Sequence, residues 1–231
     1  MAVFDLALSD EWKKEHPRAA MGVLVVDGII NTTESMALEI EKGALTKWLR
    51  ERFDSREAIK ADATLGVYAA YYKRFKKNYH VFFQLESVAV KGKPIARVNA
   101  LVEAMFMAEL KHGLLTAGHD LDAIAGEVTL DSARGDERYE TMGGEEKTLK
   151  AGDMFVRDEL AVLSSIIYGP DHRTRITEGT RRALFTIYAP EGISAGAVMA
   201  QMEDIFRWIR MFCAEAQTAK VTVYAADQGK Q

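Results

Sequence analysis

The sequence has few of the residues that mark several common protein classes. Its 231 residues include one cysteine, Cys213, and four prolines. A single cysteine excludes a disulfide framework and a zinc site built from cysteine pairs. It suits a reducing, cytoplasmic location, which we expect for this protein. We find no proline-rich linker, internal repeat or low-complexity tract, and therefore expect a single domain over residues 1–231.

Long apolar runs and an excess of one charge are also missing. No stretch approaches the roughly 18 to 20 apolar residues of a membrane helix, and the sequence is charged by Asp5. We therefore expect neither a membrane partner nor a signal peptide. The net charge of −4 gives no overall attraction to nucleic acid. Any nucleic-acid site must be a local basic patch, and we expect no DNA partner.

The apolar pattern places helices first, then a run of strands, then a last helix. In the third predicted helix, Pro94 suits the first turn and Gly113 suits the C-terminal end. This order favours an α+β fold with mixed, largely antiparallel sheets. Helices are predicted at 31–53, 56–79, 91–113 and after Ser194, and strands at 21–29, 126–133, within 137–159, 160–169, 183–190 and 219–226.

A basic and aromatic cluster lies at residues 71–80, "YYKRFKKNYH". On a helix, Tyr72, Phe75 and Tyr79 share one face, while the lysines share another. One interpretation is contact between the cations and phosphates, with bases stacked on the aromatic rings. The alternative is an amphipathic helix whose aromatic residues belong to the core and whose lysines face solvent. The four cations are Lys73, Arg74, Lys76 and Lys77.

The histidines give a weak metal signal. His119 and Asp120 form a doublet with His112 upstream, as in metal-dependent phosphohydrolases. Such a site needs ligands from other helices, and the remaining histidines supply no matching pattern. The alternative is a turn in which Asp120 or Asp122 caps the following element. We expect no metal and no cofactor.

Motifs for nucleophilic catalysis are absent as well. Ser164 and Ser165 lie within a predicted strand and lack a tight glycine elbow. Cys213 lies on an apolar helix face, where a buried, inert thiol is the usual case. "TMGGEEK" lacks the glycine spacing of a phosphate-binding loop.

The segment "YGPDHRTRIT" (168–177) follows an apolar strand. Its Gly-Pro-Asp sequence predicts a turn. Asp171 could accept a hydrogen bond from an amine or hydroxyl, and Arg173 and Arg175 could face a phosphate or carboxylate. The alternative is a surface turn that carries charged residues without a function.

Four phrases along the chain together resemble a known module. They are "PIARVNALVEAMFMAEL", "HDLDAIAGEVTLDSARGDE", "LKAGDMFVRDELAVLSSIIYGPDHRTRIT" and "LFTIYAPEGI". On these phrases, the chain is similar to the stand-alone form of the B-three/B-four module of the phenylalanyl-tRNA synthetase beta chain, over residues 65–215. Residues 1–60 would be an N-terminal strand and helix extension packed on this core.

The resemblance implies a fold and an activity. The fold would be an unusual sandwich-like arrangement of sheets flanked by helices. Within the synthetase, this module hydrolyses tyrosine wrongly attached to the phenylalanine tRNA. Its pocket lies between the sheet and the long helix, and it requires neither a metal nor a covalent nucleophile. The substrate ester, a water molecule and the terminal hydroxyl of the tRNA can react while the protein positions them.

The residues of that pocket differ here. The asparagine of the long helix falls on Phe106. The histidine just before the phrase that corresponds to "HDLDAI" falls near Ala117, and the glutamate that reads the tyrosine hydroxyl falls nearest Asp171. A different amino-acid ester, or binding without catalysis, therefore remains open. A third possibility is a repurposed scaffold that binds neither tRNA nor an amino acid.

The resemblance and the residue types together give a set of candidates. The first hypothesis is a hydrolase that clears mischarged tRNA in trans; the second is a module that binds tRNA or an amino acid without catalysis. The candidates are Asp171, His172 and Asn99 for catalysis; Glu103, Phe106, His119, Asp120, Ser164, Ser165 and Tyr168 for the amino-acid moiety; and Lys73, Arg74, Lys76, Lys77, Arg173 and Arg175 for tRNA.

Overall fold

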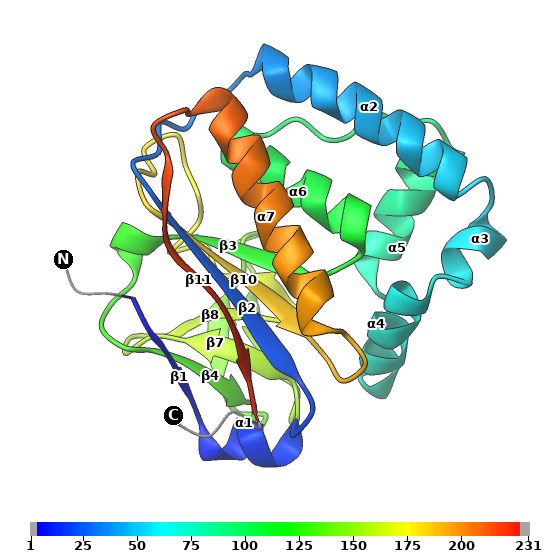
Figure 1. The fold of residues 1–231 in the computed structure, drawn as a ribbon. Coiled ribbons are helices and arrows are strands. Elements are labelled where there is room, and N and C mark those ends of the chain that lie inside the picture. Colours follow the sequence, from blue (N-terminus) through cyan, green and yellow to red (C-terminus); the bar gives the residue numbers. More distant parts are fainter. Residues whose placement is uncertain (1–3, 227–231) are drawn as a thin grey trace.

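The computed structural model describes residues 4–226, which form two stacked β-sheets and a layer of helices (Figure 1). The four-stranded sheet has the order β11-β2-β10-β3 and the five-stranded sheet the order β1-β4-β7-β8-β9. A hairpin of β5 and β6 stands beside them. The strands are β1 (Leu6–Leu8), β2 (Ala20–Asp27), β3 (Thr116–Asp120), β4 (Val128–Ser132), β5 (Arg138–Glu140), β6 (Glu146–Thr148), β7 (Met154–Arg157), β8 (Val162–Ser165), β9 (Gly169–Pro170), β10 (Ala183–Ala189) and β11 (Gln217–Ala225).

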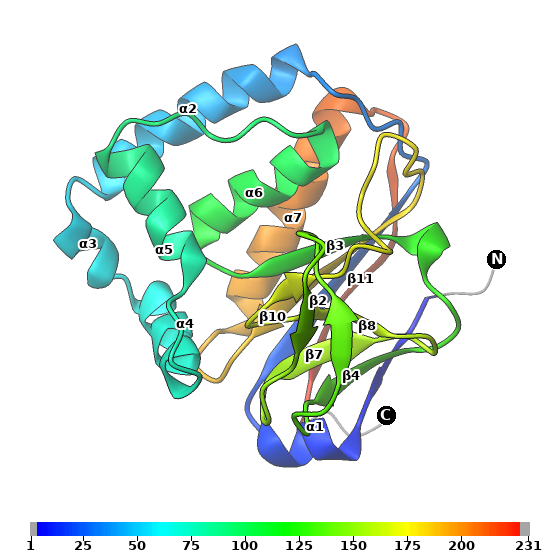
Figure 2. The same ribbon diagram turned by 180° about the vertical axis from the view of Figure 1, so that it is seen from behind.

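The strand pairing confirms the predicted fold class. β1 pairs with β4 in parallel, whereas β2, β3, β10 and β11 pair antiparallel with their neighbours, as do β4, β7, β8 and β9. The five-stranded sheet covers the back of the four-stranded sheet (Figure 2). The fold is therefore α+β, with mixed, largely antiparallel sheets in a sandwich flanked by helices.

The helices gather mainly on the outer face of the four-stranded sheet and beside it (Figure 1). α7 packs on β2 and β11, and α6 and α2 pack on α7. Within residues 4–226, no helix is both long and apolar enough to cross a bilayer. The helices are α1 (Asp10–Glu15), α2 (Met36–Arg52), α3 (Arg56–Lys60), α4 (Ala63–Arg74), α5 (His80–Leu85), α6 (Ala100–His112) and α7 (Ala195–Phe212), with a π-helical turn at Glu86–Val90 and a 3₁₀ turn at Leu121–Ala123.

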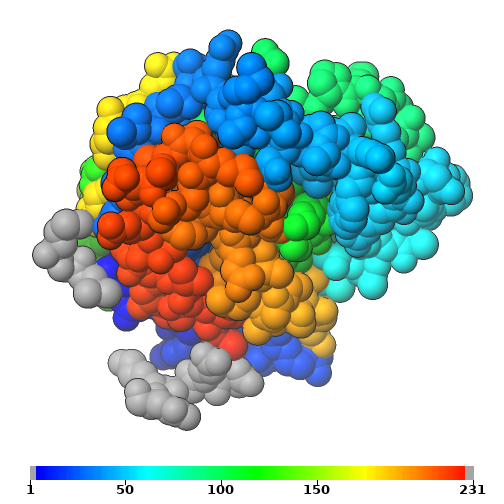
Figure 3. Space-filling model, turned by 45° about the horizontal axis from the view of Figure 1, so that its top comes forward, coloured from blue at the N-terminus to red at the C-terminus, as the bar shows by residue number. Residues whose placement is uncertain are grey.

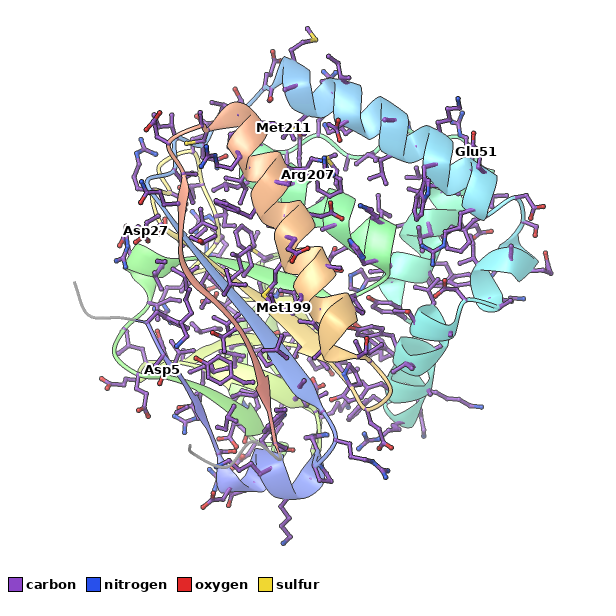
Figure 4. The ribbon with its side chains drawn as sticks, viewed as in Figure 1. Asp5, Asp27, Glu51, Met199, Arg207 and Met211 are labelled. Atoms are coloured by element: carbon purple, nitrogen blue, oxygen red, sulfur yellow. The ribbon has the colours of Figure 1, made fainter. Side chains whose placement is uncertain are left out.

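The core lies on both faces of the four-stranded sheet. Every residue of β10 is buried, because α7 covers one face of the sheet and the second sheet covers the other. α7 lies close to β2 because Gly22 has no side chain: a Cβ there would overlap Val198 Cγ1. Arg207 and Met211 lie on the outward side of α7 (Figure 4).

The segment expected as an N-terminal extension contributes to both sheets. β1 forms one edge of the five-stranded sheet, and β2 lies between β10 and β11 in the four-stranded sheet. The last predicted strand forms β11, at the sheet edge as expected. The predicted helix after Ser194 is also confirmed: the Ser194 hydroxyl accepts a hydrogen bond from the Ala197 amide and caps α7.

The predicted helix over 56–79 is wrong in extent. It consists of α3 and α4, and α4 ends at Arg74 because Lys76 adopts a left-handed φ of 57°. The buried hydroxyls of Tyr71, Tyr72 and Tyr79 donate hydrogen bonds to Asp153, the Ile166 carbonyl and the Gly113 carbonyl. Stacking of bases on these tyrosines is therefore wrong. Their place in the core, which was the alternative, is confirmed.

The predicted helix over 91–113 also begins later. α6 starts at Ala100 because the Asn99 side chain accepts a hydrogen bond from the Val102 amide, 3.1 Å away, and caps the helix. Pro94 lies in the irregular segment before it. The C-terminal end is as predicted, with Gly113 in the left-handed conformation at φ 73°.

Candidate functional site

The loop after β8 turns its acidic residue inward. Asp171 is buried and accepts hydrogen bonds from the amide and the hydroxyl of Thr174. His119 Nδ1 lies 3.7 Å from the same carboxylate. Asp171 therefore holds its own loop closed and does not face solvent.

The hydrogen bonds continue from this loop across the two sheets. His119 Nδ1 lies 2.8 Å from Thr174 Oγ1, and His119 Nε2 lies 3.3 Å from Ser164 Oγ. Ser164 Oγ lies 2.8 Å from the Tyr188 hydroxyl, which donates to the Ser164 carbonyl. We call Asp171, Thr174, His119, Ser164 and Tyr188 the intersheet network, because it joins β3 and β10 to β8 and its following loop.

The intersheet network has the order of a serine, a histidine and a carboxylate but is closed to substrate. Thr174 donates to Asp171, so its oxygen accepts from His119 Nδ1–H. The Ser164 hydroxyl donates to the Tyr188 hydroxyl, whose own proton goes to the Ser164 carbonyl. The same order occurs in hydrolase triads. Here, Ser164 and His119 are both 0% exposed, so neither water nor an ester reaches them. The supported role of the network is to hold the sheets together.

The two arginines of the loop differ in their surroundings. Arg173 donates to Asp158 at 2.7 Å and to the Ala123 carbonyl at 2.6 Å, which anchors the loop. Arg175 donates to the His172 carbonyl at 2.8 Å and is exposed. His172 is half-buried, so it is the predicted catalytic residue that reaches the surface.

The start of α6 meets the loop through a residue that the sequence did not point to. Asn31 Nδ2 donates to Asn99 Oδ1 at 3.0 Å and to the Thr177 carbonyl at 2.8 Å. Glu103 forms a buried ion pair with Lys42 at 2.6 Å. Asn99 and Glu103 are therefore both engaged in contacts within the fold.

The space expected to form a pocket between α6 and the sheet is filled beside β3. A Cβ on Gly118 would lie 2.8 Å from Ile176 Cδ1 and 3.1 Å from Met105 Sδ. Asp120 accepts from the Asp122 amide and from Thr180 Oγ1, so the capping interpretation of this segment is confirmed. Among residues 4–226, no group of three or more metal-binding side chains is assembled.

Adjoining cavities lie instead along the helical layer. An apolar cavity of about 310 Å³ is lined by Phe83, Ile95 and Phe106, among others. It shares Phe83 with a basic cavity of about 440 Å³ between α4 and α5. The apolar cavity also shares residues 93–96 with a cavity of about 750 Å³ under α2. Of the residues predicted to contact the amino-acid moiety, Phe106 lines the apolar cavity.

The basic cavity adjoins the strand end that carries the loop. Lys77 Nζ lies 5.6 Å from the centre of the Tyr168 ring. Tyr168 is half-buried, and its amide donates to Ser165 Oγ at 3.1 Å. Tyr72, on α4, donates a hydrogen bond from its hydroxyl to the Ile166 carbonyl. Lys77 thus brings the basic cavity next to Tyr168, at the end of β8.

Comparison with known proteins gives two findings. The B3/4 domain family matches residues 66–203. Among solved structures, the chain is similar to an N-terminal fragment of the phenylalanyl-tRNA synthetase beta-subunit from Pyrococcus horikoshii, with a TM-score of 0.52 and 13% identity. The similarity covers 91% of this chain and 49% of that one, so the chain spans about half of the fragment. No curated protein matches the sequence.

Proposed function

Because the chain belongs to the B3/4 domain family, we propose that it acts on the aminoacyl end of tRNA and hydrolyses mischarged tRNA in trans. The family and the fold make it a domain related to tRNA synthetases. The single observation that carries the proposal is the family match over residues 66–203. The cytoplasm, where tRNA is charged, is the proposed place of action.

The proposed reaction is hydrolysis of the ester between an amino acid and the tRNA terminus. It needs a water molecule directed at the ester carbonyl and groups that stabilise the oxyanion. His172 is the accessible candidate for proton transfer, and Tyr168 lies four residues before it, on the other side of β9. Asp171 and Asn99 are buried in contacts of the fold, so we assign them to positioning the loop and the start of α6.

A second candidate function is binding of tRNA without catalysis. The observation that favours it is the burial of Ser164, His119 and Asp171, which leaves few protein groups at the surface for chemistry. Both candidates share tRNA as the partner. They differ in whether the amino acid is released.

A deacylation screen separates the two. Purified protein is incubated with correctly charged and mischarged tRNAs, and release of the amino acid is measured. We expect one mischarged class to be hydrolysed, and His172→Ala to lower that rate by about a hundredfold, as for loss of a general acid or base. Glu178→Ala, exposed on the same loop, is the control and should retain full activity. No release from any substrate at high protein concentration would reject hydrolysis and favour binding alone.

A further inference from the structure

All charged residues that line the cavity between α4 and α5 are positive. Four cations line it, and no carboxylate does. Arg56 is paired with Glu86 at 3.4 Å, but among residues 4–226 the ion pairs include none of the three lysines. In a chain of net charge −4, such a cavity is a local attractor for anions. Its cations are Arg56, Lys60, Lys73 and Lys77.

The turn that carries two of these lysines keeps an unfavourable conformation. The Lys77 amide bonds the Tyr72 carbonyl, and the Lys76 amide bonds the Lys73 carbonyl, which is the pattern of a Schellman motif. Its left-handed position normally holds glycine, yet Lys76 occupies it at φ 57°. A non-glycine residue held at a left-handed φ stores local strain, and such strain clusters at functional surfaces.

Aromatic rings stand next to the cations. Phe82 and Phe83 pack edge to face with ring centres 5.5 Å apart. Phe83 is 45% exposed and lines both the basic and the apolar cavity. Exposed rings beside cations are the combination that binds single-stranded nucleic acid, because bases stack on the rings and the cations contact phosphates.

We propose that the cavity between α4 and α5 binds a single-stranded RNA end, with its phosphates on Lys60, Lys73 and Lys77 and a base stacked on Phe83. This inference rests on the proposed function and gives the path by which the tRNA terminus reaches Tyr168, 5.6 Å from Lys77. Arg56 and Lys60 lie on α3, outside the matched residues 66–203. The N-terminal segment therefore completes the site. Figure 3 shows α2 and α3, in blue and cyan, on one side of the molecule.

The test compares two variants of equal charge. Lys60→Gln/Lys73→Gln removes two cations of the cavity; Lys14→Gln/Lys150→Gln removes two exposed lysines elsewhere that are also without ion pairs among residues 4–226. The probes are a whole tRNA and a fluorescent ten-nucleotide RNA ending in CCA, and affinity is measured by anisotropy over a range of salt concentrations. Thermal unfolding confirms that both variants are folded.

We expect the cavity variant to bind both probes at least tenfold more weakly than the control variant. Its slope of log affinity against log salt should fall by about 1.4, since each single-strand phosphate contact accounts for about 0.7. Phe83→Ala should weaken binding about tenfold, and Phe83→Trp should restore it.

Equal affinities of the two charge variants would overturn the site. If wild-type protein still binds or deacylates tRNA in that case, the proposed function stands and the inference alone falls. Absence of both binding and deacylation in the wild-type protein would reject the two together.

Discussion

At the scale of single residues, burial separates groups that are available for chemistry from groups that hold the fold. Asp171 is a predicted catalytic residue because it follows a turn, can accept a hydrogen bond, and lies nearest to the pocket glutamate of the module that the chain resembles. Its carboxylate, however, accepts two hydrogen bonds from Thr174 and lies 3.7 Å from His119. Sequence reasoning could not show this, since the partners lie on another strand or depend on how the loop turns.

Asp171→Ala should therefore destabilise the protein. Removal of the carboxylate leaves buried donors of Thr174 unpaired, which costs roughly 1–3 kcal/mol. His172→Ala, on the surface, should change the free energy of unfolding by about 0.5 kcal/mol or less. Urea denaturation of both variants measures this difference. Equal stability of Asp171→Ala and wild type would contradict the assigned role.

Glu109 gives a pH-dependent prediction. Burial raises its pKa to about 8, above its value of 4.5 in the unfolded chain. Its contribution to stability is fully present below pH 4.5, and it is lost as the pH rises through 8, because the unfolded state releases the proton first. Glu109→Gln stays neutral, and its side-chain oxygen can still accept the bond from the Thr116 amide.

The variant should gain stability relative to wild type as the pH rises. We expect the difference in free energy of unfolding to shift by roughly 2–5 kcal/mol in favour of Glu109→Gln between pH 5 and pH 8.5. Urea denaturation of both proteins at pH 5 and at pH 8.5 gives the difference in free energy of unfolding at each pH. A difference that does not change with pH would show that Glu109 is ionised throughout.

At the scale of elements, the sequence predicted which segments are helices or strands better than it predicted where they begin and end. The strands β2, β10 and β11 and the helix α7 follow from apolar pattern and caps, and all were expected near their observed positions. The helix ends were missed where a cap overrides periodicity. Asn99 begins α6 five residues after Pro94, and Lys76 ends α4 although lysine favours helices.

Lys76→Gly tests the strain at the end of α4. Glycine adopts a positive φ without steric cost, so the variant should raise the free energy of unfolding by about 0.5–1 kcal/mol. Lys77→Gly removes the same charge at a position without positive φ and should lower stability. Thermal and urea unfolding compare them. A loss of stability in both variants would mean that the left-handed turn carries no strain.

At the scale of the whole molecule, the net charge is negative while one cavity is lined by cations. The net charge of −4 excludes general attraction to RNA, while the phrases of the sequence led to the fold and family that the comparisons support. Of the predicted tRNA contacts, Lys73 and Lys77 line one cavity, while Arg173 anchors its own loop. Arg56 and Lys60 were missed because they join this cavity only through packing of α3 beside α4.

The central claim is that tRNA is the partner, and its affinity at several salt concentrations tests it most directly. Deacylated tRNA and purified wild-type protein are mixed between 50 and 200 mM salt, and bound tRNA is measured by filter retention. We predict binding at low salt and a slope of log affinity against log salt of about −2 to −3, as expected for three to four single-strand phosphate contacts. No retention at 50 mM salt, or an affinity that does not depend on salt, would contradict the account.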